Sequence, residues 1–423
     1  MRHIETLENG VRVAIEPMEH VNSVSFGIWV GTGSRFENEK LSGAAHFIEH
    51  MLFKGTSSRS AREIAEQVEE RGGSLNAFTS REVTSYYVKA LAEDLGFCME
   101  VLSDMLFHST FAGEEILREK NVVMEEINMY EDTPDDLIHD LQLASLYHEH
   151  PLGNSILGTA RSIGGLTRDD LLGFMKDNYA GENTVLSVAG NVDPRVVLDL
   201  ARTHFGSMER TARLLETAAP VEHRGFHFVP KKTEQINFCL GRVSFPREHP
   251  DFYKLLLLNN MLGGSASSRL FQEIREKRGL VYSTYSYLST FNDSGTLTIY
   301  GGTSPDSFDE VLKIIGEIYR DLREGGISGR ELERNRNQIR AQLLLAGETA
   351  SSRMKKMGGQ LLGEGRIIED EEIIAAMEAV TLDDLHQFAR SFLDLEQSTL
   401  TFIGPSADEQ VQKTWSDLGG CCL

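Results

Sequence analysis

The hydrophobic and polar positions in the first half of the chain predict a strand followed by two helices. In Val24–Gly31 (VSFGIWVG), residues alternate between the two faces, a pattern typical of a β-strand. After a glycine-rich turn, the apolar run Gly43–Phe53 predicts a helix. Ser60 and Glu63 form the S-x-x-E pattern of a capping box, so a second helix begins there, and the glycines after Arg71 end it.

The second half of the chain repeats this order of elements. Ile236–Gly241 predicts a strand and Phe252–Leu262 an apolar helix, and a Gly-Gly-Ser turn then leads to a further helix that ends near Gly279. We therefore expect two homologous half-domains, 1–213 and 229–423, joined by a linker at 214–228. The predicted fold class is α+β, with each half a mostly antiparallel sheet covered by helices. Two such halves facing one another would enclose a cavity.

Composition and charge narrow the classes of function. The 423 residues are 40% hydrophobic and 25% charged, as in an ordinary soluble globular protein, and no apolar run approaches the roughly 20 residues of a membrane helix. The net charge of −22 argues against nucleic acid and membrane surfaces as partners, and it would favour a basic peptide unless it serves solubility alone. The four cysteines show no disulfide framework and the N-terminus no targeting segment, so we expect a cytoplasmic protein.

One motif in the first predicted helix carries chemistry. His46 and His50 are four residues apart, so on a helix they project from one face and could supply two ligands of a tetrahedral zinc. Glu49 lies beside His50, where its carboxylate could reach a water molecule on the same metal. The order H-x-x-E-H is the inverse of the commoner zincin motif. Because histidines on apolar helices are more often core residues, the hypothesis needs a third ligand.

Comparison of the two halves tests this motif. When the two apolar helices are overlaid, the apolar frame persists while the polar residues change: His46, Glu49 and His50 fall on Leu256, Asn259 and Asn260. Packing of the helix therefore does not require the histidines and the glutamate.

The same comparison supplies a third ligand. The predicted helix from Glu114 to Tyr130 matches a helix in the second half, and there Glu119 and Glu126 fall on amide residues, Asn335 and Gln342. Glu119 and Glu126 are two helical turns apart and share a face. We interpret Glu126 as the third zinc ligand and Glu119 as a carboxylate that supports the site or faces the substrate. A solvated helix face would be the alternative interpretation.

These segments together resemble the pitrilysin family of zinc peptidases. The resemblance is carried by His46–His50, Glu119, Glu126, Gly73–Thr79 (GSLNAFT) and Arg275–Tyr282 (REKRGLVY), and it covers essentially the whole chain. Among the branches of the family, the chain is most similar to the β-subunit of the mitochondrial processing peptidase and its bacterial single-chain relatives.

The resemblance implies roles for these residues. It implies that one Zn²⁺ per chain is bound by His46, His50 and Glu126. Glu49 would be the general base, with Glu119 supporting the site. Arg275 and Tyr282 would complete the active site from the second half, with Tyr282 stabilising the oxyanion. Without the resemblance, Arg275 would be interpreted as a surface residue and Tyr282 as a core residue of a strand.

A further segment is similar to the substrate-binding edge of the family. It consists of Asn76, Ala77, Phe78 and Thr79. An exposed strand edge offers N–H and C=O groups to an extended peptide, although an ordinary edge strand would have the same sequence pattern.

We therefore expect a zinc endopeptidase that hydrolyses short or unfolded, and by charge basic, peptides in an enclosed chamber. Two alternatives stay open. The chain could be a noncatalytic assembly subunit, like the core proteins of respiratory complexes that share the fold, or a protease dedicated to maturing one peptide. Some family members carry four half-domains and this chain two, so we expect a partner to help enclose the chamber. Because Arg275 and Tyr282 are present beside the zinc motif, we expect that partner to be a second copy, although the two residues could also act within one chain.

Overall fold

The computed structural model describes residues 2–211, 218–405 and 409–421, which form two compact units. The first unit contains residues 2–128, 154–211 and 344–368, and the second contains 129–153, 218–343 and the described residues from 369 onward. Each unit therefore takes one segment from the other half of the chain. This differs from the contiguous half-domains 1–213 and 229–423 expected from the sequence.

The first unit is built on a six-stranded sheet with the order β1-β2-β6-β3-β5-β4. Neighbouring strands are antiparallel except β2 and β6, which are parallel. Among the described strands, β4 pairs with β5 alone, so one of its sides is an open edge. The strands are β1 (His3–Thr6), β2 (Arg12–Pro17), β3 (Ser23–Val30), β4 (Ser74–Thr79), β5 (Thr84–Leu91) and β6 (Thr184–Gly190).

Helices cover both faces of this sheet. On one face they share a large core with the strands, and on the other face lies α12, a helix from the second half of the chain. The helices of this unit are α1 (Ala44–Leu52), α2 (Ala61–Glu69), α3 (Leu95–His108), most of α4 (Gly113–Glu131), α6 (Ala160–Gly165), α7 (Arg168–Asn178), α8 (Pro194–Phe205) and α12 (Ala350–Gly363).

Strand β3 shows how the sheet separates the two layers. Trp29 packs in the cluster around α12, whereas the alternate apolar residues point to the opposite core: Val24, Phe26, Ile28 and Val30. Glycine is required where helix and sheet approach most closely. A Cβ on Gly27 would lie 2.6 Å from the sulfur of Met354, and one on Gly358 would lie 2.2 Å from the Trp29 indole nitrogen.

The second unit repeats the architecture with a five-stranded sheet of order β7-β11-β8-β10-β9. Strands β7 and β11 are parallel and the other neighbours antiparallel, which is the pattern that β2-β6-β3-β5-β4 shows in the first unit. The strands are β7 (Gly225–Pro230), β8 (Ile236–Ser244), β9 (Val281–Thr290), β10 (Gly295–Thr303) and β11 (Thr399–Gly404). The repeated order of elements predicted from the sequence is thus present in both sheets.

The helices of the second unit include one contributed by the first half of the chain, α5. The set is α5 (Pro134–Tyr147), α9 (Phe252–Leu262), α10 (Pro305–Arg323), most of α11 (Gly329–Ala346), α13 (Asp370–Ala379), α14 (Leu382–Phe392) and α15 (Glu409–Asp417), with a π-helical segment at Phe271–Glu276.

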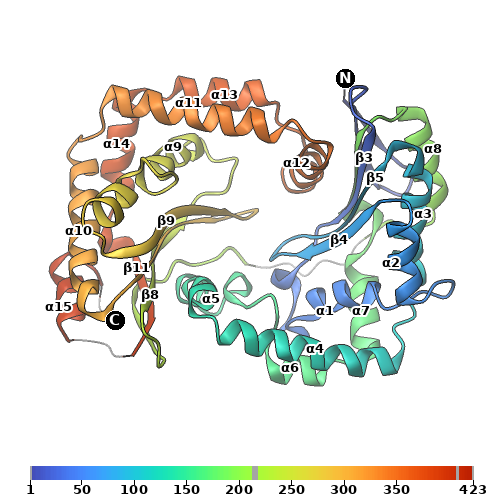
Figure 1. Ribbon diagram of the computed structural model, residues 1–423, viewed down its shortest axis with the longest axis horizontal. Coiled ribbons are helices and arrows are strands. Elements are labelled where there is room, and N and C mark those ends of the chain that lie inside the picture. The colour runs from blue at the N-terminus through green and yellow to red at the C-terminus, as the bar shows by residue number, and fades with distance from the viewer. Residues whose placement is uncertain (1, 212–217, 406–408, 422–423) are drawn as a thin grey trace. The chain divides into compact units, whose positions relative to one another are not determined.

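The two halves of the chain exchange one helix each. Helix α12 packs on β3 and β6 of the first unit, and α5 packs on β8 and β11, the equivalent strands of the second unit. In Figure 1 the orange α12 accordingly lies beside the blue strand β3. The exchange is reciprocal, because α5 follows α4 in the first half just as α12 follows α11 in the second.

The structure also bears on the expected linker and on the expectation that the chain has no membrane helix. In the expected linker 214–228, residues 214–217 lie outside the described residues, and β7 already begins at Gly225. Across the described ranges, every helix is too short or too polar to cross a membrane.

Candidate metal centre

Helix α1 is held at its first turn by a buried carboxylate. Glu37, 4% exposed, accepts hydrogen bonds from the backbone N–H groups of Gly43 and Ala45, both at 2.7 Å. Burial raises the pKa of Glu37 to about 7, although these two hydrogen bonds oppose the shift. Helix N-termini leave such N–H groups unpaired and attract negative charge, so Glu37 fixes where α1 begins.

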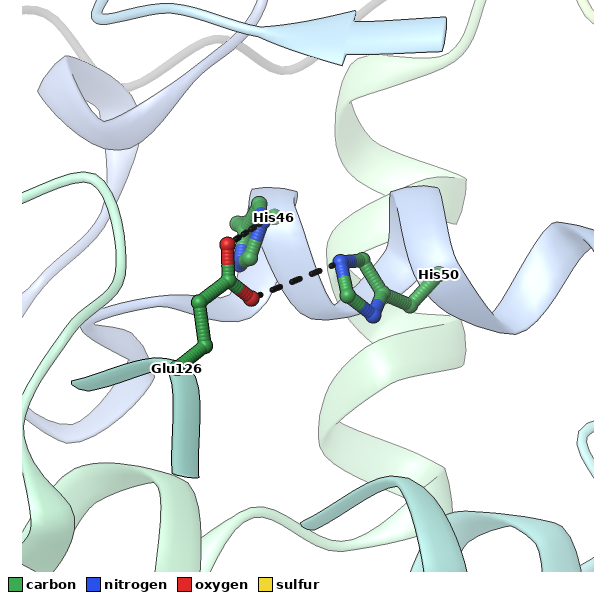
Figure 2. A group of neighbouring side chains, drawn as sticks. All are labelled: His46, His50 and Glu126. Carbon is green, nitrogen blue, oxygen red and sulfur yellow. Dashed lines mark ion pairs between the residues drawn. The ribbon is translucent and has the colours of Figure 1, made fainter. Parts of the chain in front are cut away.

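Three side chains of the first unit converge as the sequence analysis predicted. His46 and His50 project from one face of α1, and Glu126 extends toward both from α4 (Figure 2). The two carboxylate oxygens of Glu126 each lie 3.8 Å from an imidazole Nε2, one from His46 and one from His50. One potential ligand atom from each residue lies within 4.8 Å of the other two.

The donor set fits zinc. Two imidazole nitrogens and one carboxylate oxygen are ligands that zinc takes in hydrolases, where a fourth position stays open to water. Burial, and next the neighbouring His50, lower the pKa of His46 to about 4, so at neutral pH this imidazole is neutral, as a metal ligand must be. The assignment of the three residues as ligands is a prediction that this geometry supports.

His50 is supported by a buried ion-pair chain. Its Nδ1 lies 2.7 Å from Glu119 Oε1, and the other oxygen of Glu119 lies 2.7 Å from Lys54 Nζ. Glu119 is 1% exposed. Burial alone would raise its pKa, but the hydrogen bond with His50 and the ion pair with Lys54 hold that pKa below its usual value. A proton on Nδ1 facing Glu119 leaves Nε2 of His50 available to a metal.

The two histidines differ in this support. Burial would lower the pKa of His50, but its hydrogen bond with Glu119 and the nearby carboxylates, Glu126 among them, raise that pKa above its usual value. The Nδ1 of His46 is buried and has no hydrogen-bond partner within the described residues.

Glu49 lies on the same helix and has a partner of its own. The Thr79 hydroxyl donates to Glu49 Oε2 at 2.5 Å. Burial raises the pKa of Glu49, with the Thr79 hydrogen bond opposing the shift. A carboxyl group whose pKa moves toward neutrality is suited to accept and then release a proton.

The predicted substrate edge is the open edge strand β4. Its register pairs Asn76 with Tyr87 and Thr79 with Thr84 of β5. Asn76 is exposed, and its side chain accepts a hydrogen bond from the backbone of Ala77. The Phe78 ring packs edge-on against Trp29, with ring centroids 5.6 Å apart. An open edge is therefore present, and peptide binding there stays a prediction.

Arg275 and Tyr282 belong to the second unit. Arg275 lies in the π-helical segment, and its guanidinium carbon is 5.5 Å from the centroid of the Tyr282 ring. Tyr282 is 82% exposed on β9, so it is not the core residue that strand periodicity alone would suggest. Their catalytic roles stay predictions.

Three features of this centre were not predicted from the sequence. Glu37 as a helix cap had no recognisable spacing, because its contact to α1 runs through an irregular turn. Lys54 lies four residues after His50, the spacing of one helical turn, which could have suggested that it joins the same group of side chains. Thr79 was assigned to the substrate, whereas its hydroxyl contacts Glu49.

Comparison with known proteins defines the class. Residues 12–160 match the model of the insulinase family, peptidase family M16, and residues 165–339 match the model described as the peptidase M16 inactive domain. The Bacillus subtilis protein named uncharacterized zinc protease YmxG is 44% identical over 403 residues, which cover 95% of this chain and 98% of that one. A Mycobacterium tuberculosis protein named uncharacterized zinc protease Rv2782c is 38% identical and covers 92% of this chain and 90% of its own. The chain belongs to peptidase family M16, the pitrilysin family.

Solved structures of the family have the same fold. A protease from Helicobacter pylori superposes with a TM-score of 0.88 at 25% identity, covering 96% of this chain and 99% of its own. A Pseudomonas fluorescens structure described as a peptidase M16 inactive domain gives a TM-score of 0.89 at 19% identity, covering 96% of this chain and 98% of its own. The two-unit fold is therefore that of M16 proteins along nearly the whole chain.

Proposed function

We propose that this protein is a zinc endopeptidase in which His46, His50 and Glu126 hold one zinc ion per chain and Glu49 is the general base. The observation that carries the proposal is the convergence of these three ligands beside a carboxylate whose pKa is raised. Membership of family M16 and the names of the relatives, zinc proteases, support it.

The residues divide the chemistry between them. His46, His50 and Glu126 would hold a zinc ion, which would supply Lewis-acid activation of a water molecule. As general base, Glu49 would accept a proton from the attacking water and return it to the leaving amine. Glu119 keeps the Nδ1 proton on His50 and so fixes the ring orientation.

The substrate we propose is a short or unfolded peptide, basic rather than acidic, cleaved in an enclosed chamber. An extended peptide can pair with the open edge of β4, where backbone groups recognise any sequence. The net charge of −22 favours cationic peptides at low ionic strength. A homodimer, a cytoplasmic location and oxyanion stabilisation by Tyr282 with Arg275 nearby complete the proposal.

The test is metal content measured beside peptide cleavage, for the wild type and Glu49→Gln. We expect one zinc per chain in both proteins and cleavage of a quenched basic peptide by the wild type alone, because the substitution removes the base and keeps all three ligands. Zinc with equal cleavage by Glu49→Gln would overturn the role of Glu49. Absence of zinc and of cleavage in the freshly purified wild type would favour a noncatalytic assembly subunit. Profiling with a peptide library would show whether one peptide is strongly preferred, as in a dedicated maturation protease.

A further inference from the structure

The hydrogen bond between Thr79 and Glu49 joins the last residue of the edge strand to the helix of the metal centre. Along β4, side chains alternate between the two faces of the sheet, and Leu75 and Ala77 pack in the core shared with α1. Thr79 continues that series, and its hydroxyl lies 2.5 Å from Glu49 Oε2. The Thr79 side chain is therefore engaged with the helix beneath the strand rather than with the open edge.

Within the part of the chain that the structure describes, the carboxylate of Glu49 takes part in one hydrogen bond. Among the described residues, Thr79 is the one hydrogen-bond partner of its oxygens, so Oε2 is held and Oε1 is left without a partner. A glutamate side chain rotates about three bonds, and a proton acceptor must lie within hydrogen-bond reach of the proton it takes. A donor on one oxygen restricts that rotation and leaves the other oxygen to act.

We propose that Thr79 is a positioning residue for the general base: its hydroxyl holds Oε2 of Glu49 so that Oε1 is oriented to accept the proton of the attacking water. This inference rests on the proposed peptidase function and changes the role of Thr79 from substrate contact to orientation of Glu49. Because β4 also offers its backbone edge to the peptide, substrate alignment and base orientation depend on the same strand.

The test compares two substitutions of Thr79. Thr79→Val keeps the shape of the side chain and removes the donor, whereas Thr79→Ser keeps the donor. General bases contribute about 10²- to 10⁴-fold, and a loosened base loses part of that, so we expect kcat of Thr79→Val to fall about tenfold with KM within about twofold of the wild type. Thr79→Ser should restore most of kcat. Thr203→Val, the same change at an exposed position of α8, is the matched control and should retain wild-type kcat and KM.

A binding measurement separates the two roles of Thr79 without turnover. In the inactive Glu49→Gln background, the affinity for a fluorescent basic peptide is measured by anisotropy with Thr or Val at position 79, together with zinc content. Equal affinities and equal zinc support the inference. A weaker affinity for Val at position 79, or a raised KM with unchanged kcat, overturns it and returns Thr79 to substrate binding.

The remaining outcomes are also decisive. Loss of zinc or a lower melting temperature in Thr79→Val, with no recovery in Thr79→Ser, overturns the inference in favour of a structural role. A wild type that cleaves peptide no faster than Thr79→Val overturns the inference and leaves the proposed function intact. A wild type that holds zinc and cleaves nothing overturns the proposed function and the inference with it.

Discussion

Each unit contains an equivalent pair of packed helices, but the side chains at the contact between the two helices differ. In the first unit, His50 on α1 contacts Glu119 on α4 at 2.7 Å. In the second, Asn260 on α9 donates to Asn335 on α11, also at 2.7 Å. Asn260 and Asn335 are both buried. Both units thus have a hydrogen-bonded polar pair between these helices, and in the second unit it is a neutral amide pair.

The position of the third candidate ligand, Glu126, also differs between the units. Gln342, the counterpart of Glu126, is exposed on α11, and Leu256 stands where His46 would be. In the first unit, Glu37 also accepts hydrogen bonds from the backbone N–H groups of Gly43 and Ala45 at the start of α1. The two units thus share the helix arrangement, and the first unit has charged and imidazole side chains at positions where the second has amide and apolar side chains.

Glu126→Gln gives the first unit the residue that the second carries. Because an amide oxygen is a much weaker zinc ligand than a carboxylate, we expect zinc affinity to fall more than about 100-fold and cleavage to be lost. The measurement is zinc content after dialysis against a chelator, beside peptide turnover. Glu125→Gln, on the exposed neighbour, is the control and should keep both. Full zinc retention by Glu126→Gln would remove this residue from the ligand set.

Lys54→Met removes the cation that accompanies Glu119. A buried carboxylate left without its partner is costly, and it can be relieved by movement of the Glu119 side chain away from His50. Loss of such supporting contacts weakens metal binding by about 10- to 100-fold, which a competition assay with a zinc indicator would measure. Lys54→Arg keeps the charge and should stay closer to the wild type. In the second unit, Gly264 occupies the equivalent position, as the amide pair there requires no cation.

Zinc affinity should depend on pH through His50. Because the pKa of His50 is raised, a proton competes with the metal below that pKa, and affinity should fall about tenfold for each pH unit there. The decline steepens toward pH 4, where His46, whose pKa is about 4, also protonates. Calorimetry in buffers of different ionisation enthalpy would detect the proton released on binding near neutral pH. A binding enthalpy independent of the buffer would contradict this.

Asn260→Ala tests the second unit and should leave the metal centre unchanged. Removal of the donor leaves the buried Asn335 oxygen without its hydrogen bond from Asn260, so we expect the free energy of unfolding to fall by about 2 kcal/mol. Denaturant unfolding measures the change, and zinc content should equal that of the wild type. Lower zinc in a folded Asn260→Ala protein would show that the second unit affects the centre.

Local features of the fold could be predicted from the sequence. The boundaries of α9 coincide with the predicted Phe252–Leu262, and the capping box of Ser60 and Glu63 opens α2 as expected. Both depend on interactions within one or two helical turns. The convergence of His46 and His50 follows from a spacing of four, and Glu126 was found because the repeat provided an internal comparison.

The exchange of helices could not be predicted in the same way. Apolar periodicity in α5 and α12 shows that each helix has a face to bury, and both candidate sheets offer apolar surface of similar character. The choice depends on tertiary complementarity, such as the close approach of Gly358 to Trp29. The contact between Thr79 and Glu49 was missed for a related reason, since a strand end and a helix thirty residues apart in sequence meet only in the folded unit.

The exchanged helix α12 is synthesised long after the strands that it covers in the first unit. During synthesis, the strands that carry Trp29 and Val185 leave the ribosome long before Met354 and Met357, which cover them in the finished protein. The first unit therefore lacks the layer formed by α12 until the second half of the chain has been translated. A prematurely terminated product would present an uncovered apolar sheet face to chaperones and proteases.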